Sequence, residues 1–284
     1  MTRSGVGAVE TFSNQRTSNQ RMSRSGRATL LLLCIFVIAC LGAVYFVGDL
    51  AKYQEIISAK ESQAALRGVN DPQQIDQALK QFPSNNILKL VALANKESTE
   101  IDAATQRLLS EVEPKRLAKQ IDLGASSSSD LDALRQDLKI AESNAATLQP
   151  RYIALIKAER DKVENDARSI KVGNNTIAKF MAMIDEQDAE MTDLISKVSA
   201  ARAEYYSAYE KCAALLVREF GIYKVENGQF VFPFQYSADS YNRAAAAMAA
   251  ATKRIAELEN ERATLGQSRL NRWKTFADRQ TTGS

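Results

Sequence analysis

Residues 176–219 read TIAKFMAMIDEQDAEMTDLISKVSAARAEYYSAYEKCAALLVRE. Positions reached in alternating steps of three and four are apolar or aromatic in ten of thirteen cases, which is the spacing of a coiled-coil seam. A helix over these residues would be roughly 66 Å long. The thirteen seam positions are Ile177, Met181, Ile184, Asp188, Met191, Ile195, Val198, Arg202, Tyr205, Tyr209, Cys212, Leu216 and Glu219.

Asp188 and Arg202 interrupt this apolar seam with charged side chains. A polar seam residue can fix the register and the number of helices in a coiled coil, at a cost in stability. Alternatively, solvent reaches these two positions locally, or the true seam is shifted by one residue. Both interpretations remain open from the sequence, and neither gives the two residues a catalytic role.

Two further long helices are expected on either side of this stretch, over residues 131–171 and 239–278. Both repeat the alternating steps of three and four, and short breaks between helices favour antiparallel neighbours. We therefore predict an elongated antiparallel helical bundle or coiled coil over residues 130–284. Its fourth helix would come either from residues 86–122 or from a second copy of the chain.

The segment between the last two long helices has a β pattern. Residues 224–234 read KVENGQFVFPF, and Asn227-Gly228 is the preferred pair for a two-residue hairpin turn. We predict one short β-hairpin within residues 223–236 in an otherwise all-α chain. Because exposed aromatic side chains anchor interfaces, these rings form a candidate partner surface; alternatively, they pack onto the end of the bundle. The candidate residues are Tyr223, Phe230, Phe232, Phe234 and Tyr236.

Residues 28–47 form a run of twenty uncharged residues, which matches the roughly 30 Å hydrocarbon core of a bilayer. Residues 1–27 carry five arginines and one acid, and such positive flanks stay on the cytoplasmic side. We predict a disordered basic cytoplasmic tail, a single-pass transmembrane helix over 28–47, and residues 48–284 outside the cytoplasm. This is the topology of a bacterial inner-membrane protein with a periplasmic domain.

Two other interpretations of the apolar run exist. A cleaved secretory signal has an apolar region of about 7–15 residues, which is shorter than this run. Val37-Ile38-Ala39-Cys40 resembles a bacterial lipobox, whose cysteine is lipidated, but seven more uncharged residues follow Cys40. The length of the run favours an uncleaved anchor.

Residues 48–124 are predicted to form a stalk and a helical membrane-proximal region. Asp71 and Pro72 supply an N-cap and a first-turn proline for a short helix that ends near Phe82. The serine-rich residues 125–129 are expected to link this region flexibly to the bundle.

The composition argues against several classes of function. The chain has no histidine, which removes the commonest general base and the commonest metal ligand. It has three cysteines, two of which lie in the apolar run, so no disulfide framework is expected. Beyond residue 47 there are 32 basic and 33 acidic residues, which gives no electrostatic basis for binding nucleic acid. We predict no enzyme, and no catalytic, cofactor or metal site.

These features favour a non-enzymatic, membrane-anchored coiled-coil scaffold or structural protein. Its expected partners are the lipid bilayer and other proteins, including further copies of itself. The alternative is an extracytoplasmic helical-bundle sensor or ligand-binding module that signals through a partner. An adaptor for secretion or efflux ranks last, because such adaptors carry β-rich domains and this chain offers one short hairpin.

Overall fold

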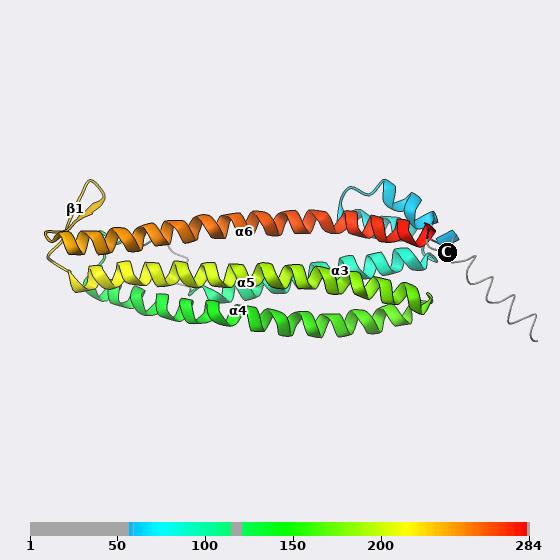
Figure 1. Ribbon diagram of the computed structural model, residues 1–284, viewed down its shortest axis with the longest axis horizontal. Coiled ribbons are helices and arrows are strands. Elements are labelled where there is room, and N and C mark those ends of the chain that lie inside the picture. Colours follow the sequence, from blue (N-terminus) through cyan, green and yellow to red (C-terminus); the bar gives the residue numbers. More distant parts are fainter. Residues whose placement is uncertain (1–56, 59, 115–120, 283–284) are drawn as a thin grey trace, which may run out of the picture. The chain divides into compact units, whose positions relative to one another are not determined.

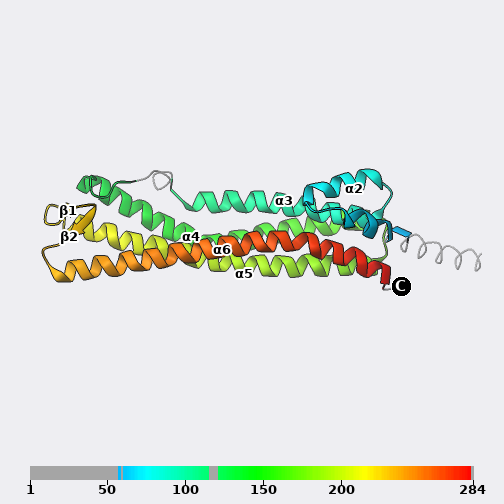
Figure 2. The same cartoon turned by 90° about the horizontal axis from the view of Figure 1, so that it is seen from above.

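The computed structural model describes residues 57–58, 60–114 and 121–282, and 83% of these residues are helical. Four long helices run alongside one another and alternate in direction (Figure 1, Figure 2). The prediction of a mostly helical fold is thus confirmed for the described residues. The helices are α3 (Asn86–Val112), α4 (Ser128–Ser169), α5 (Asn174–Arg218) and α6 (Gln235–Thr282).

The predicted cytoplasmic tail, the predicted membrane segment at 28–47 and the first part of the predicted stalk lie outside the described residues. Within the described part of the chain, no helix combines the length and the apolar character that a membrane span requires. The described residues belong to one compact unit, Gln54–Ser284, which includes parts of both regions predicted at 48–124 and 130–284.

α5 lies between α4 and α6, and it packs along both of them. α3 packs along α4 and makes fewer contacts with α6, so the fourth helix of the bundle comes from the same chain. It ends at Val112 rather than near residue 122. The cause is Pro114, because Glu113 before it takes the extended conformation that a following proline favours. Between the end of α3 and the hairpin, the bundle has three long helices among the described residues.

The seam predicted on α5 is largely buried, but the buried surface of this helix is wider than one seam. Phe180, Leu194 and Leu215 are buried beside it, because α5 is covered on one side by α4 and on the other by α6. The polar positions Asp188 and Arg202 are half-buried, as are two of the tyrosines. The buried apolar seam positions are Ile177, Met181, Ile184, Met191, Ile195, Val198, Cys212 and Leu216.

A second layer covers the start of α3. The short helix η1 (Pro72–Gln74) leads into α2 (Ile75–Gln81), and the carboxylate of Asp71 accepts a hydrogen bond from the backbone N–H of Gln73 at 2.9 Å. Asn85 begins α3 by accepting from the backbone N–H of Leu88 at 2.9 Å. These caps satisfy N–H groups that a helix start leaves without a partner.

The β-hairpin consists of β1 (Lys224–Glu226) and β2 (Gln229–Val231). Asn227 and Gly228 have φ values of 51° and 75°, as the predicted two-residue turn requires. α6 begins at Gln235 rather than near Asp239, because Pro233 cannot donate a ladder hydrogen bond and the carbonyl of Phe234 already accepts helical hydrogen bonds. Tyr236 therefore belongs to α6 and not to the hairpin.

The burial pattern of α4 gives a test of the packing. Leu138 is 0% exposed, whereas Ile140, two residues further on, is 54% exposed. Leu138→Ala should lower the free energy of unfolding by about 2–5 kcal/mol, because it removes buried methyl groups and leaves a cavity. Ile140→Ala should change it by less than about 0.5 kcal/mol. The measurement is urea unfolding of the full-length protein in mild detergent, followed by far-ultraviolet circular dichroism; equal losses would show that α4 packs through another face.

Candidate functional site

The aromatic residues at the hairpin end fall into two groups. Tyr223, Phe230, Phe232 and Tyr241 are half-buried and pack against one another, with ring centroids 5.3–6.5 Å apart. Tyr241 belongs to α6, so this ring cluster fastens the hairpin to the last helix. Such ring pairs each stabilise by about 0.5–1.5 kcal/mol beyond the area they bury.

The second group is exposed. Phe234 is 60% exposed and Tyr236 is 67% exposed, and the guanidinium of Arg218 lies 5.9 Å from the centre of the Tyr236 ring. Among the described residues, six of the nine exposed large apolar side chains lie within residues 220–236, at the end that carries the hairpin (Figure 1). We term these six the apolar end surface: Phe220, Ile222, Val225, Val231, Phe234 and Tyr236.

The five residues predicted as a partner surface are thus divided. Tyr223, Phe230 and Phe232 pack within the ring cluster, as the bundle-end interpretation requires. Phe234 and Tyr236 are open to solvent, as the partner-surface interpretation requires. The sequence could not separate them, because both groups consist of Phe and Tyr and follow one another within the same short segment.

Arg202 lies where α3 ends. Its Nη1 donates a hydrogen bond to the carbonyl oxygen of Leu109 at 3.1 Å. Leu109 belongs to the last turn of α3, where carbonyls have no partner within the helix and a positive charge is favourable. Arg202 therefore joins α5 to α3 at the level where the bundle changes from four helices to three.

Asp188 lies half-buried beside a small, partly open cavity of about 30 Å³. Side chains from all four long helices line this cavity, among them Tyr152 of α4 and Arg269 of α6. Burial raises the pKa of the Asp188 carboxyl to about 6, the charge of Asp185 adds to the rise, and Arg269 opposes it. Asp188 is thus the titratable member of a polar layer in the bundle core.

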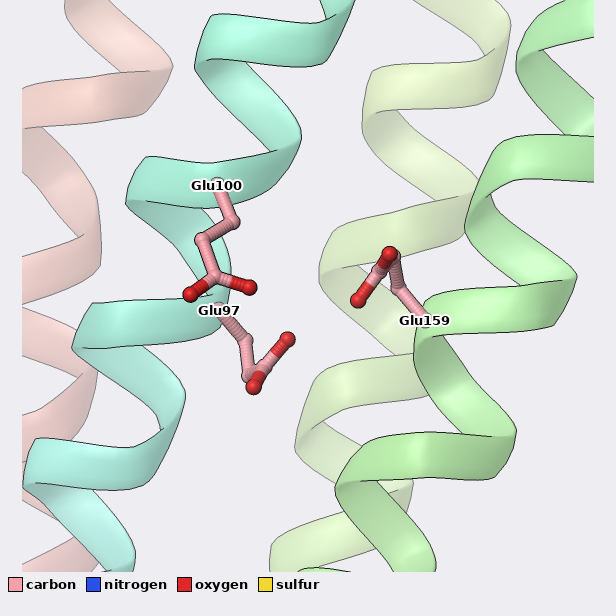
Figure 3. Close-up of side chains that lie close together, drawn as sticks. All are labelled: Glu97, Glu100 and Glu159. Carbon is pink, nitrogen blue, oxygen red and sulfur yellow. The ribbon is translucent and has the colours of Figure 1, made fainter.

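A group of three carboxylates joins α3 to α4 (Figure 3). Oxygens of Glu97, Glu100 and Glu159 lie within 4.8 Å of one another, a spacing that could hold a metal ion. The ammonium of Lys162 already occupies this position, at 3.2 Å from Glu97, 2.8 Å from Glu100 and 3.4 Å from Glu159. The pKa of the buried Glu97 is raised by desolvation, and Lys162 opposes the rise. The arrangement is therefore an ion-pair network with its own cation.

The sequence did not single out Tyr152, Arg269, Arg272 or Lys162. These residues meet their partners across different helices, and spacing along one helix carries no signal of such a meeting. Asp188 and Arg202 were visible in the sequence, because each is a charged residue at an apolar position.

No protein-family model, no curated protein and no solved structure matches the chain. The function is therefore inferred from the geometry of these sites.

The buried position of Asp188 makes the stability of the bundle depend on pH. The folded pKa of about 6 exceeds the ordinary value of 3.8, so the stability that this group contributes is fully present below about pH 4 and is lost as the pH rises through 6. Asp188→Asn removes the charge and should raise the free energy of unfolding at pH 7.5 by about 1–2 kcal/mol, since partial exposure reduces the full effect. Near pH 4 the variant should match the wild type.

The measurement is urea unfolding at both pH values, followed by fluorescence of Trp273, the one tryptophan of the chain. Asp193→Asn, at an exposed position of the same helix, should change stability little at either pH. A loss of stability in Asp188→Asn of equal size at pH 4 and pH 7.5 would contradict the buried-charge explanation.

Proposed function

We propose that this chain is a non-enzymatic, membrane-anchored scaffold whose helical bundle presents the apolar end surface to another protein. In this proposal residues 28–47 anchor the chain in the inner membrane of a bacterium, with the N-terminus in the cytoplasm and the bundle outside it. The observation that carries the proposal is the gathering of exposed large apolar side chains within residues 220–236.

Exposed apolar surface of this kind is unfavourable in water, and its burial against a partner is favourable. Burial of apolar surface contributes about 25 cal/mol per Å², and aromatic residues contribute most of the binding energy at protein interfaces. The ring cluster fastens the hairpin to α6 and so holds the neighbouring surface in place, which reduces the conformational entropy lost when a partner binds. Arg218 and the charged residues of the hairpin supply the polar rim that such interfaces have.

The position of the surface also supports a scaffold. Residues 60–67 and the hairpin lie at opposite ends of the long helices (Figure 1). The chain enters the bundle at one end and presents the apolar end surface at the other. α5 alone spans roughly 67 Å at 1.5 Å per residue, so the bundle acts as a spacer between the two.

Paired substitutions test the docking surface. Phe234→Ser with Tyr236→Ser should leave the unfolding temperature of the full-length protein within about 2 °C of the wild type, because both side chains are exposed. The same variant should lose the partner that wild-type protein retains in mild detergent. Phe230→Ser with Phe232→Ser is the matched control, and it should lower the unfolding temperature because it dismantles the ring cluster.

Partner proteins are identified by mass spectrometry and their binding is measured again with purified components. Light scattering of the same samples reports self-association. Full partner binding by the Phe234 and Tyr236 variant would contradict the proposal.

The proposed topology rests on the arginine asymmetry around residues 28–47. A reporter that is active only outside the cytoplasm should work when fused after Ser284 and fail when fused before residue 28. The intact mass should retain residues 1–27 and show no lipid on Cys40. The reverse reporter pattern, or a mature chain that begins at Cys40, would contradict the anchor.

A second candidate function is a ligand-binding module that signals through a partner. The observation that favours it is an open groove of about 670 Å³ between α5 and α6, within the range of small-molecule sites. Met183 and Phe276 supply apolar surface there. Lys179 and Arg279 supply positive charge that would favour an anionic ligand, and Glu186 supplies one negative charge. A small anion that raised the unfolding temperature of the wild type but not of Lys179→Ala would favour this function.

A further inference from the structure

The small, partly open cavity beside Asp188 is a polar site in a largely apolar core. Its volume is about 30 Å³, and one water molecule needs about 10–15 Å³ of such space, so it has room for two or three. All four long helices contribute polar side chains to its wall: Ser98 of α3, Tyr152 of α4, Gln187 and Asp188 of α5, and Arg269 and Arg272 of α6.

Three buried polar atoms of this wall have no hydrogen-bond partner among the described residues. They are Oη of Tyr152, Nε2 of Gln187 and Nη1 of Arg272. The side chain of Tyr152 is 0% exposed, so bulk solvent does not reach its hydroxyl. Gln187 Nε2 and Arg272 Nη1 are donors only, and burial raises the pKa of the Tyr152 hydroxyl, which keeps it a donor as well. Buried donors left without an acceptor are strongly unfavourable.

We propose that this cavity binds two or three ordered water molecules, which accept hydrogen bonds from Tyr152, Gln187 and Arg272 and donate to the carboxylate of Asp188. The result is one hydrated polar layer that crosses α3, α4, α5 and α6. This site is independent of the proposed scaffold function, because it lies inside the bundle and away from the apolar end surface.

The charges around the cavity favour water over an anion. Arg269 pairs with Asp102 at 2.8 Å, and Arg272 pairs with Glu190 at 2.5 Å, so both cations already have a counter-ion. A halide could accept from the three donors but could not donate to Asp188, and it would add a negative charge beside it. Water does both. The charged or titratable groups that surround Asp188 are Asp102 of α3, Tyr152 and Arg160 of α4, Asp185 and Glu190 of α5, and Arg269 and Arg272 of α6.

The hydrated layer gives the bundle a fixed register. Its donors and acceptor come from different helices and satisfy one another, through water, only at one level of the bundle. If α5 slid by one turn, Gln187 and Asp188 would face apolar side chains and lose these partners. In this proposal the register role, which was one of the two interpretations of Asp188, belongs to the whole layer rather than to this residue alone.

Tyr152→Phe in the full-length protein separates a hydrated cavity from a dry one by the sign of its effect. In a hydrated cavity the variant loses a hydrogen bond to water, and the unfolding constant should rise about fivefold, the change that one hydrogen bond gives. In a dry cavity the variant removes an unpaired hydroxyl, and the unfolding constant should fall instead. Tyr236→Phe, which deletes the same hydroxyl at an exposed position, should leave the constant within about twofold.

Bound water is observed directly by nuclear Overhauser transfer from water to the side-chain amide of Gln187, whose signal is assigned from its loss in Gln187→Leu. The proposal expects this transfer in the wild type, and no stabilisation by chloride beyond that by sulfate at equal ionic strength, since sulfate itself stabilises folded proteins by its exclusion from their surface. A fall of the unfolding constant in Tyr152→Phe, the absence of the transfer, or stabilisation specific to chloride would each overturn it.

Discussion

α5 must bury apolar side chains on two sides at once, and the rest of the bundle follows from this requirement. Its residues contribute to both hydrophobic clusters of the core, and α4 and α6 cover it from either side. The short connection at 170–173 lets α5 run back along α4. The hairpin then lets α6 run back along the other side of α5. An antiparallel arrangement is the direct result, because links this short cannot carry the chain to the far end of a long helix.

α3 buries apolar side chains in both clusters of the core, and polar contacts at its edges add to this packing. Lys162 of α4 binds its glutamates, Arg202 of α5 binds its last turn, and Arg269 of α6 pairs with Asp102. Each of the other three long helices thus supplies a cation to the shortest one. These charged contacts are spread along the part of the core where the fourth helix is present. The three-helix part beyond it ends in the hairpin, where the apolar end surface supports the proposed docking role.

The sequence predicted those features that repeat along the chain. The three-four period predicted the long helices, and Asn227-Gly228 predicted the turn, because both signals are local. The wide buried surface of α5 was not predicted, because the spacing of three and four residues describes contact with a helix on one side only. The hydrogen bond between Arg202 and Leu109 and the ion pair between Arg269 and Asp102 join residues that are distant in the sequence, so they were not predicted. The division of the aromatic residues into ring cluster and exposed pair was not predicted, because it depends on the contacts of the hairpin with Tyr241 of α6, which is distant from Tyr223 in the sequence.

The central claim is that the four long helices of one chain pack in this order and register, and zero-length cross-linking tests it most directly. A carbodiimide couples lysine to a carboxylate only when the two are in contact. In the full-length protein it should join Lys162 to Glu100, which are 2.8 Å apart, and Lys139 to Glu210, which are 3.6 Å apart. In a mixture of isotopically labelled and unlabelled chains, these links should form within single chains. Links that join labelled to unlabelled chains at these positions, or the absence of both pairs, would contradict the account.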